Sequence, residues 1–396
     1  MITDQLKDIL VDEIVKGLIG QGSEGLKSVL ESLLNAAMKI ERENFLGAAA
    51  HERTEERKGY ANGYKSKGLQ TRMGALTLEI PQVRGLGFYP QSLEKGSRSE
   101  KALKLAIAEM YLQGVSTRRV QDITEKLCGY EVSSTQVSRV TQELDEQFEQ
   151  FRNRPIEEIC YLILDAIYLK VRYNGSVIDM AILLAYGVTP EGKREILGVS
   201  ASLSEAEVHW REFLQSLQSR GMRGLRLVIS DDHAGLKKAR MAVFPSVPWQ
   251  RCLFHLCQNA QSYAPKKSMK SEIAEVMREI FNSPTLEMAQ EMKRQALEKY
   301  KKRAPEFAKW LEENADESLT FYQFPKEHWK KIRTSNGIER VNREIKRRTR
   351  VAVLFPNKES ALRLVTGVVQ EIHEEWVTGR QYLDMSCLKS GYLKNE

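Results

Sequence analysis

Hydrophobic positions in the first part of the chain recur mostly with the period of an α-helix. Over residues 3–50, apolar side chains return every three or four positions, which predicts two or three amphipathic helices. Over residues 76–80 they alternate with polar side chains before a proline, which predicts a strand. Residues 51–68 are rich in glycine and charge and are interpreted as a connector. The basic side chains over 53–72 suit a phosphate contact and a solvated loop equally well.

Three further helical stretches follow, and the last two are separated by a short break. They are predicted over residues 102–113, 116–127 and 134–148. Serines at positions 116 and 133 or 134 are good N-cap residues for the last two. Two short helices joined by a glycine-containing turn form either an ordinary helical hairpin or a helix-turn-helix. In a helix-turn-helix, the residues that open the second helix would read bases in a major groove, and here these are Ser134, Thr135, Gln136 and Arg139.

From residue 159 the pattern changes to β-rich runs. Three consecutive antiparallel strands are predicted over residues 159–173, 177–188 and 195–203, with Asn-Gly and Pro-Glu-Gly-Lys turns between them. A helix, a strand, a second helix and another β segment follow over 205–220, 225–230, 234–244 and 249–253. Three meandering strands followed by α-β-α-β is the order of an RNase H-like domain. The predicted fold class is therefore α/β with a mixed sheet.

The region after this domain is helical and strongly charged. Residues 263–325 are polar, rich in Lys and Glu and punctuated by prolines, and are predicted to form an all-α insertion. A further helix is predicted over residues 334–350. The stretch from Lys326 to Arg350 holds ten Lys or Arg and three acids, and this surplus of 10 − 3 = +7 equals the net charge of the whole chain. So concentrated a charge favours a polyanionic partner, and nucleic acid in particular.

Glu339 lies in the first turn of this basic helix. Helical spacing places four side chains on its face, namely Asn342, Arg343, Lys346 and Arg350. A phosphodiester would fit along that face. A second interpretation is structural, because Asn336 and Glu339 have the spacing of a helix-capping box.

Length and composition exclude several classes of protein. The chain has 396 residues, 42% of them hydrophobic, which suffices for two or three packed domains. Its apolar runs are too short for a membrane span, and no secretory signal is indicated at the N-terminus. Five scattered cysteines form no disulfide framework, which suits a reducing cytoplasm.

Two further acids stand at predicted strands of the central sheet. Asp165 interrupts a run that is apolar on both faces, and a lone charge there is costly unless a cation or an ion pair offsets it. Asp231 closes the strand over 225–230, although its neighbour Asp232 is an equal candidate by pattern, and Asp231 also suits an N-cap. With Glu339 as a third carboxylate, these acids would suit Mg²⁺ ions and phosphoryl transfer.

Cys252 and His255, with Cys257 close by, suggest a zinc site. A structural zinc ion needs four ligands, and no second spaced pair is found in the sequence. Zinc is therefore not expected, and His255 is interpreted as a residue that orients a group near the acids or packs in the core.

Taken together, the motifs resemble the Mutator-type DDE transposases of bacterial insertion sequences. The resemblance covers most of the chain and rests on the order and spacing of its motifs. These are Gly59-Tyr60-Ala61-Asn62-Gly63-Tyr64, the stretch Met110 to Arg118, Leu164-Asp165-Ala166, Glu207 with Trp210, Ser230-Asp231, Trp249 to Cys252 with His255, Arg333 to Asn342, Lys346 to Thr349 and Phe355-Pro356. The sequence departs from the family pattern at Asp232, where a small residue is usual.

The resemblance implies a function and a set of site residues. Asp165, Asp231 and Glu339 would be the catalytic and metal-binding triad, and Cys252 and His255 the Cys-x-x-His signature beside the site. The implied cofactor is Mg²⁺ or Mn²⁺, as two ions. The implied protein is a bacterial, nucleoid-associated homodimer that binds terminal inverted repeats, nicks there and joins the freed 3′-hydroxyl to target DNA. Arg343, Lys346, Arg347 and Arg350 would then position phosphates.

Five segments are expected from these patterns. They are an N-terminal helical DNA-binding and dimerisation region with a short β segment, a helix-turn-helix-like region, the first part of an RNase H-like catalytic core, the all-α insertion, and the last part of the core with the Glu339 helix and a C-terminal helix. Their bounds are 1–98, 99–152, 153–262, 263–325 and 326–396.

Two alternatives stay open at this point. One is an RNase H-like endonuclease that cuts without joining, and the other is a catalytically inert DNA-binding regulator derived from a transposase.

Overall fold

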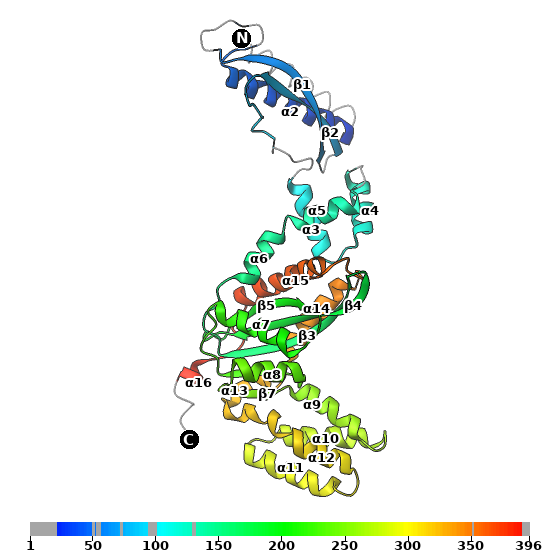
Figure 1. The fold of residues 1–396 in the computed structure, drawn as a ribbon, viewed down its shortest axis with the longest axis vertical. Helices are drawn as coiled ribbons and strands as arrows, with labels where there is room; N and C mark the ends of the chain where they lie inside the picture. Colours follow the sequence, from blue (N-terminus) through cyan, green and yellow to red (C-terminus); the bar gives the residue numbers. More distant parts are fainter. Residues whose placement is uncertain are drawn as a thin grey trace. The chain divides into compact units, whose positions relative to one another are not determined.

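The structure is a computed structural model of the whole chain, and its elements are labelled in Figure 1. It divides into two compact units, the first ending at Glu143 and the second beginning at Leu144. The described residues are 22–49, 52, 57–71, 74–93, 101–128, 132–350 and 352–389. The helices predicted before residue 22 and the glycine-containing break at 129–130 lie outside them. No helix in these ranges combines the length and apolar character needed to cross a membrane.

The first unit opens with a helix packed on a β-hairpin. Helix α2 (Gly22–Leu46) covers strand β2 (Gly74–Arg84), which pairs antiparallel with β1 (Tyr60–Thr71). Buried side chains at alternate positions of β2 pack against α2, as the alternation predicted; they are Leu76, Leu78 and Ile80, with Met38 from the helix.

Strand β1 contradicts the prediction of a connector over residues 51–68. Most of its side chains are exposed, so no hydrophobic period marks it in the sequence. Backbone pairing with β2 imposes the extended conformation instead, and Gly63, at φ +73°, lies at a register shift between the strands. The predicted strand is also longer than expected and continues past Pro81.

Three helices complete the first unit. These are α3 (Lys101–Leu112), α4 (Thr117–Cys128) and α5 (Ser134–Gln142). Ser116 Oγ accepts a hydrogen bond from the Arg119 backbone N–H at 3.3 Å, and Ser133 forms a reciprocal capping box with Gln136. The predicted caps at Ser116 and Ser133 are therefore confirmed, whereas Ser134 is the first helical residue.

The prediction of a single helix over residues 134–148 is wrong. Helix α5 ends at Gln142, and a new helix, α6 (Asp145–Asn153), lies at the start of the second unit. The acids on either side of the break have different partners, since Glu143 pairs with Lys104 and Asp145 with Arg363. Helix α6 packs on α15 and β5, within the second unit. The predicted segment bounds had placed most of this helix in the preceding segment, 99–152.

The second unit is built on a five-stranded mixed sheet. Its strands are β3 (Tyr161–Tyr173), β4 (Ser176–Val188), β5 (Arg194–Ser202), β6 (Leu227–Ser230) and β7 (Trp249–Arg251). The order across the sheet is β5-β4-β3-β6-β7, with β3, β4 and β5 antiparallel and β6 and β7 parallel to β3. Asn174 and Gly175, both with positive φ, make the predicted β3–β4 turn. The predicted mixed α/β architecture is thus confirmed.

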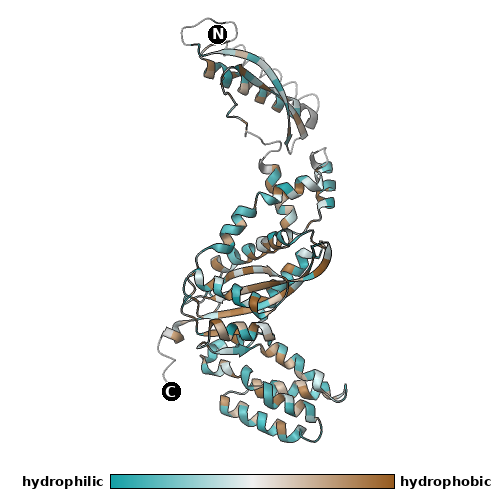
Figure 2. Cartoon of the chain, in the orientation of Figure 1, coloured by the Kyte–Doolittle hydropathy of each residue, from teal (hydrophilic) through white to brown (hydrophobic). Residues whose placement is uncertain are grey.

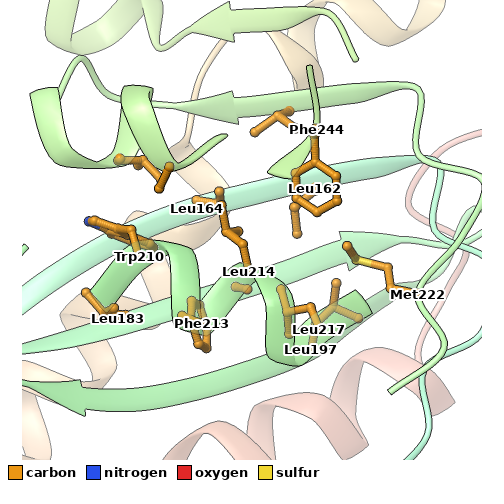
Figure 3. Packing of buried hydrophobic residues seen from close by; sticks show 14 of the residues in the cluster. Leu162, Leu164, Leu183, Leu197, Trp210, Phe213, Leu214, Leu217, Met222 and Phe244 are labelled. Carbon is orange, nitrogen blue, oxygen red and sulfur yellow. The ribbon is translucent and has the colours of Figure 1, made fainter. Parts of the chain in front are cut away.

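One face of this sheet carries the largest hydrophobic cluster. Helix α7 (Glu207–Ser219) lies on it, with α8 (Ala234–Val243) beside α7. Figure 3 shows the apolar side chains of α7 against those of the strands; they are Trp210, Phe213, Leu214 and Leu217 on the helix and Leu162, Leu164, Leu183 and Leu197 on the sheet. Figure 2 shows the same contrast, because the strands of this sheet are mostly coloured as hydrophobic whereas its helices carry both hydrophobic and hydrophilic residues.

The opposite face is covered by the C-terminal helices. Helix α14 (Asn336–Thr349) contacts β3 and β4, and α15 (Lys358–Thr378) contacts β5 and β3. Because side chains alternate along a strand, residues 161, 163 and 165 of β3 face away from the α7 cluster. Asp165 therefore lies on the α14 side of the sheet.

Residues 263–325 are helical, as predicted. Helix α9 (Leu253–Ala260) leads from β7 into α10 (Met269–Phe281), α11 (Leu286–Tyr300) and α12 (Pro305–Asn314), which pack on one another and on α9 (Figure 1). Three short 3₁₀ turns accompany them at Gln261–Tyr263, Asp316–Ser318 and Thr320–Gln323. Helix α13 (Lys326–Ile332) then returns the chain to the sheet, and α16 (Ser386–Lys389) is the last described element.

Candidate active site

Asp165 lies in the middle of β3, and two hydrogen bonds hold its carboxylate. Oδ1 accepts from the backbone N–H of Ala166 at 2.9 Å, and Oδ2 accepts from Asn342 Nδ2 of α14 at 2.6 Å. Within the described ranges Asp165 forms no ion pair with a Lys or Arg, so the structure does not support the ion-pair interpretation. Both oxygens are oriented by these bonds, and among the described residues the charge of His255 partly offsets that of Asp165.

The structure distinguishes the two acids that follow β6. Asp231 lines the same cavity as Asp165. Asp232 is turned to the other side, where it pairs with the buried Arg251 at 3.0 Å and with Lys237 at 3.7 Å. The N-cap of α8 is His233 and makes no side-chain cap, so the N-cap interpretation of Asp231 is wrong. Asp231 is the neighbour placed to act together with Asp165.

Glu339 does not cap its helix. The N-cap of α14 is Ser335, Asn336 is already helical, and no side chain caps this end, so the capping-box interpretation is wrong. Ser335 is instead held by Cys252, whose Sγ accepts from the Ser335 backbone N–H at 3.3 Å and from its Oγ at 3.0 Å. Glu339 Oε1 is buried and has no hydrogen-bond partner among the residues that the structure describes. A buried, unpartnered carboxylate oxygen is costly unless a ligand contacts it.

The three acids meet at one open cavity of about 480 Å³. They come from β3, the end of β6 and α14, three elements far apart in the sequence. Arg343 and Lys346 of α14 also line it, together with His255 and Asn342. This cavity combines oxygen donors with cationic side chains and so suits a phosphate group and the metal ions that accompany it.

Burial, followed by repulsion from Asp231, raises the pKa of Asp165 from 3.8 to about 7. The charged form of Asp165 therefore destabilises the folded protein. The folded protein is free of this penalty below about pH 4, and it loses stability as the pH rises through about 7. In metal-free buffer at pH 8, Asp165→Asn is expected to raise the free energy of unfolding by about 1–2 kcal/mol. Chemical denaturation in EDTA measures this difference.

Two comparisons make that result specific to Asp165. The gain should shrink towards zero as the pH falls to 4 and below, because the wild-type carboxyl is then neutral in the folded protein and becomes neutral in the unfolded chain as well. Asp179→Asn removes an exposed acid of the same sheet, paired with Lys170 at 3.1 Å, and should change the stability by less than about 0.5 kcal/mol. A gain for Asp165→Asn of equal size at pH 4 and pH 8 would contradict the assignment of the penalty to the charge.

Cys252 and His255 lie beside the three acids. Burial alone would raise the pKa of the Cys252 thiol, but hydrogen bonds from His255 and Ser335 together lower it. The interaction with Cys252 is also the largest cause that raises the pKa of His255 to about 9. The ligand atoms of Cys252, His255 and Glu339 all lie within 4.8 Å of one another. Glu339 thus supplies a third donor that no sequence spacing revealed, although a structural zinc ion takes four.

The structure divides the other predicted contact residues. Arg343 and Lys346 line the cavity, whereas Arg347 pairs with Glu344 at 2.7 Å and Arg350 follows the end of α14; neither of these two lines it. Of the residues of α5 predicted to read bases, Ser134, Thr135 and Arg139 have exposed side chains. Gln136 is occupied by the capping box and by Gln70, to which its Nε2 donates at 3.2 Å.

Comparison with known proteins places the chain in a family. Residues 3–379 match the family described as Transposase, Mutator family. The transposase for insertion sequence element IS406 of Burkholderia multivorans (strain ATCC 17616 / 249) is 50% identical over 371 residues, 93% of this chain and 96% of that protein. The transposase for insertion sequence element ISRM5 of Rhizobium meliloti (strain 1021) is 41% identical over 376 residues, 95% and 94% of the two chains.

A more distant relative gives the same result. The transposase for insertion sequence element IS256 in transposon Tn4001 of Staphylococcus aureus is 36% identical over 364 residues, 90% of this chain and 93% of that protein. The class of protein is thus an insertion-sequence transposase. The chain belongs to the Mutator family, and the resemblance found in its motifs is confirmed.

Proposed function

We propose that this transposase binds the terminal inverted repeats of its own element, cleaves DNA strands there and joins the freed 3′-hydroxyl to target DNA. The observation that carries the proposal is the convergence of Asp165, Asp231 and Glu339 on one cavity that Arg343 and Lys346 also line. Carboxylates from three elements would serve little structural purpose there, since neither Asp165 nor Glu339 pairs with a Lys or Arg in the part of the chain that the structure describes.

The donors present fit Mg²⁺ or Mn²⁺. Carboxylate oxygens are the ligands these ions prefer, and the unpartnered Glu339 Oε1 is free to bind. Asp165, Asp231 and Glu339 would hold the ions, as a pair by the family resemblance. When bound, the ions would lower the pKa of the attacking water or 3′-hydroxyl and stabilise negative charge on the leaving oxygen.

The residues of the chain do the positioning. Asn342 and the Ala166 N–H fix the Asp165 carboxylate, so its free lone pairs point in a set direction. Arg343 and Lys346 would hold the phosphate at the mouth of the cavity, and the Cys252–Ser335 contact would anchor the start of the helix that carries Glu339. In-line displacement at phosphorus depends mainly on such positioning and on electrostatic stabilisation.

The fold supports the same function. The strand order β5-β4-β3-β6-β7, with three antiparallel strands and two parallel ones, is the order of an RNase H-like domain, which we assign to the second unit. Helices α4 and α5 would form the helix-turn-helix, with the exposed Ser134, Thr135 and Arg139 of α5 reading bases. The protein would act as a homodimer that brings two element ends together on nucleoid DNA in the cytoplasm.

Labelled DNA of the element's ends tests this function. Purified protein with Mg²⁺ is expected to nick at the end of the repeat and to join pre-nicked ends to a target duplex, and sizing the products separates the two steps. Nicked products without joined products would indicate an endonuclease, and binding without either would indicate an inert regulator. Metal analysis of the purified protein would show a bound zinc ion if Cys252, His255 and Glu339 formed a structural site.

A further inference from the structure

A second basic recess lies on the neighbouring face of α14. It has a volume of about 330 Å³ and is formed between α14, β5 and α15, with Arg194, Arg340, Arg343, Arg347 and Trp376 among its lining residues. We call it the arginine groove. Arg343 lines both this groove and the cavity of the three acids, so the two adjoin each other along the helix.

Helical spacing explains why one helix serves both sites. Arg340, Arg343, Glu344 and Arg347 follow one another at intervals of three or four residues and share a face. Glu339, Asn342, Arg343 and Lys346 form the adjacent face in the same way. From Arg340 to Arg347 the helix rises about 10 Å, which matches about three stacked nucleotides.

Four arginines and two acids, Glu344 and Glu375, line the groove, so its positive charge is only partly neutralised. Glu344 accepts hydrogen bonds from Arg347 at 2.7 Å and from Arg348 at 2.8 Å, and the bond from Arg347 is the largest cause that lowers its pKa to about 2. Arg340 is exposed, and neither it nor Arg343 forms an ion pair with any described residue. Two cations of the groove therefore stay available to a ligand.

One wall of the groove is rigid. The guanidinium of Arg194 lies 4.0 Å from the centre of the Trp376 ring and 4.5 Å from that of Tyr382. Trp376 in turn contacts the buried Tyr186 of β4 edge-on, with ring centroids 5.2 Å apart. A cation fixed between two aromatic rings presents its charge in one place, which favours a ligand of regular spacing such as a sugar-phosphate backbone.

We propose that the arginine groove binds the DNA backbone beyond the reacting phosphate, so that the strand passes from the catalytic cavity across α14 to Arg340 and Arg194. This inference rests on the proposed function and adds to it a second contact region on the same DNA. An acidic protein segment is the competing occupant, but Arg343 is shared with the cavity proposed to bind the reacting phosphate, and this favours DNA.

Binding measurements with full-length protein carrying Asp165→Asn test the groove without strand cleavage. The probes are two duplexes with the terminal inverted repeat of the element, one trimmed at the cleavage position and one extended beyond it by flanking DNA. Adding Arg340→Gln should weaken binding of the extended duplex by about three- to tenfold and lower the slope of log affinity against log salt by about one. Binding of the trimmed duplex should not change.

Arg211→Gln is the matched control, because it removes an exposed arginine from α7, on the other face of the sheet. It should leave both duplexes unaffected. Equal loss on both duplexes, or no loss on either, would overturn the proposal. A change in oligomeric state by light scattering, with the salt slope unchanged, would show a protein interface and would also overturn it.

These outcomes differ from those that test the proposed function. Cleavage and joining are measured with wild-type protein and Mg²⁺, whereas the groove is measured by binding alone. Suppose that wild-type protein does not cleave, but that Arg340→Gln lowers the salt slope of binding by about one. That pair of results would support DNA binding by the arginine groove and contradict the proposed cleavage and joining.

Discussion

Asp165→Asn, Asp231→Asn and Glu339→Gln should each lower strand cleavage by about 10³-fold or more while the protein still binds the element's ends. Each change replaces one negative charge with a neutral amide of nearly the same shape, so the packing around the cavity is kept. The lost charge would weaken metal binding and the stabilisation of the transition state. Cleavage of labelled ends in Mg²⁺, with binding followed by gel shift, measures both properties.

Asp232→Asn is the matched control for that series. It alters the acid next to Asp231, but its carboxylate pairs with Arg251 and does not line the cavity. We expect cleavage within about threefold of wild type at a temperature where the variant is folded. If Asp232→Asn were inactive and Asp231→Asn active, the ligand would be Asp232, and the orientation found for the two side chains would be incorrect.

Gly337→Ala should reduce cleavage by about a hundredfold, because it displaces the helix that carries Glu339. A Cβ at this position would overlap the hydroxyl of Tyr186, and the Cζ of that ring would lie 2.8 Å away. Tyr186 is fully buried and packs edge-on against Trp376, so its side chain has little room to move. The first turn of α14 must therefore shift away from β4.

A second substitution distinguishes this displacement from general loss of stability. Tyr186→Phe removes the closest atom, and added to Gly337→Ala it should recover part of the lost cleavage. Gly87→Ala, at a position where an added Cβ meets nothing within 4 Å, should have no effect. Gly337→Ala with full cleavage, or with no recovery from Tyr186→Phe, would show that this contact does not position Glu339.

Much of the second unit could be predicted from the sequence. The runs over residues 159–173 and 177–188 differ from β3 and β4 by at most two residues, because buried apolar runs bounded by Asn-Gly leave few alternatives. The helices α7 and α8 follow from a clear helical period in the same way. The strand β1 was missed because its side chains are exposed, and pairing with β2 decides its conformation.

The candidate site was predictable only as far as the residue types and their local patterns. Asp165 is conspicuous as an acid in an apolar strand, and Asn342 could be placed near Glu339 by helical spacing. The hydrogen bond between Asn342 and Asp165 joins positions far apart in the chain, and no local pattern reports it. The same holds for the hydrogen bond from Ser335 to Cys252, which also joins distant positions. This bond holds the start of α14, where the sequence predicted a capping box of Asn336 and Glu339.

The sequence by itself determined the order of strands β3 to β7 with helices α7 and α8, the family, and two acids of the proposed site, Asp165 and Glu339. Local periodicity and turn chemistry carry that information, because they act between residues a few positions apart. Only the tertiary structure decided that Asp231 rather than Asp232 faces the cavity, that Glu339 leaves its helix end uncapped, and that the basic helix serves two recesses. Those outcomes depend on which distant side chains supply partners, such as Arg251 for Asp232, and the folded packing alone sets them.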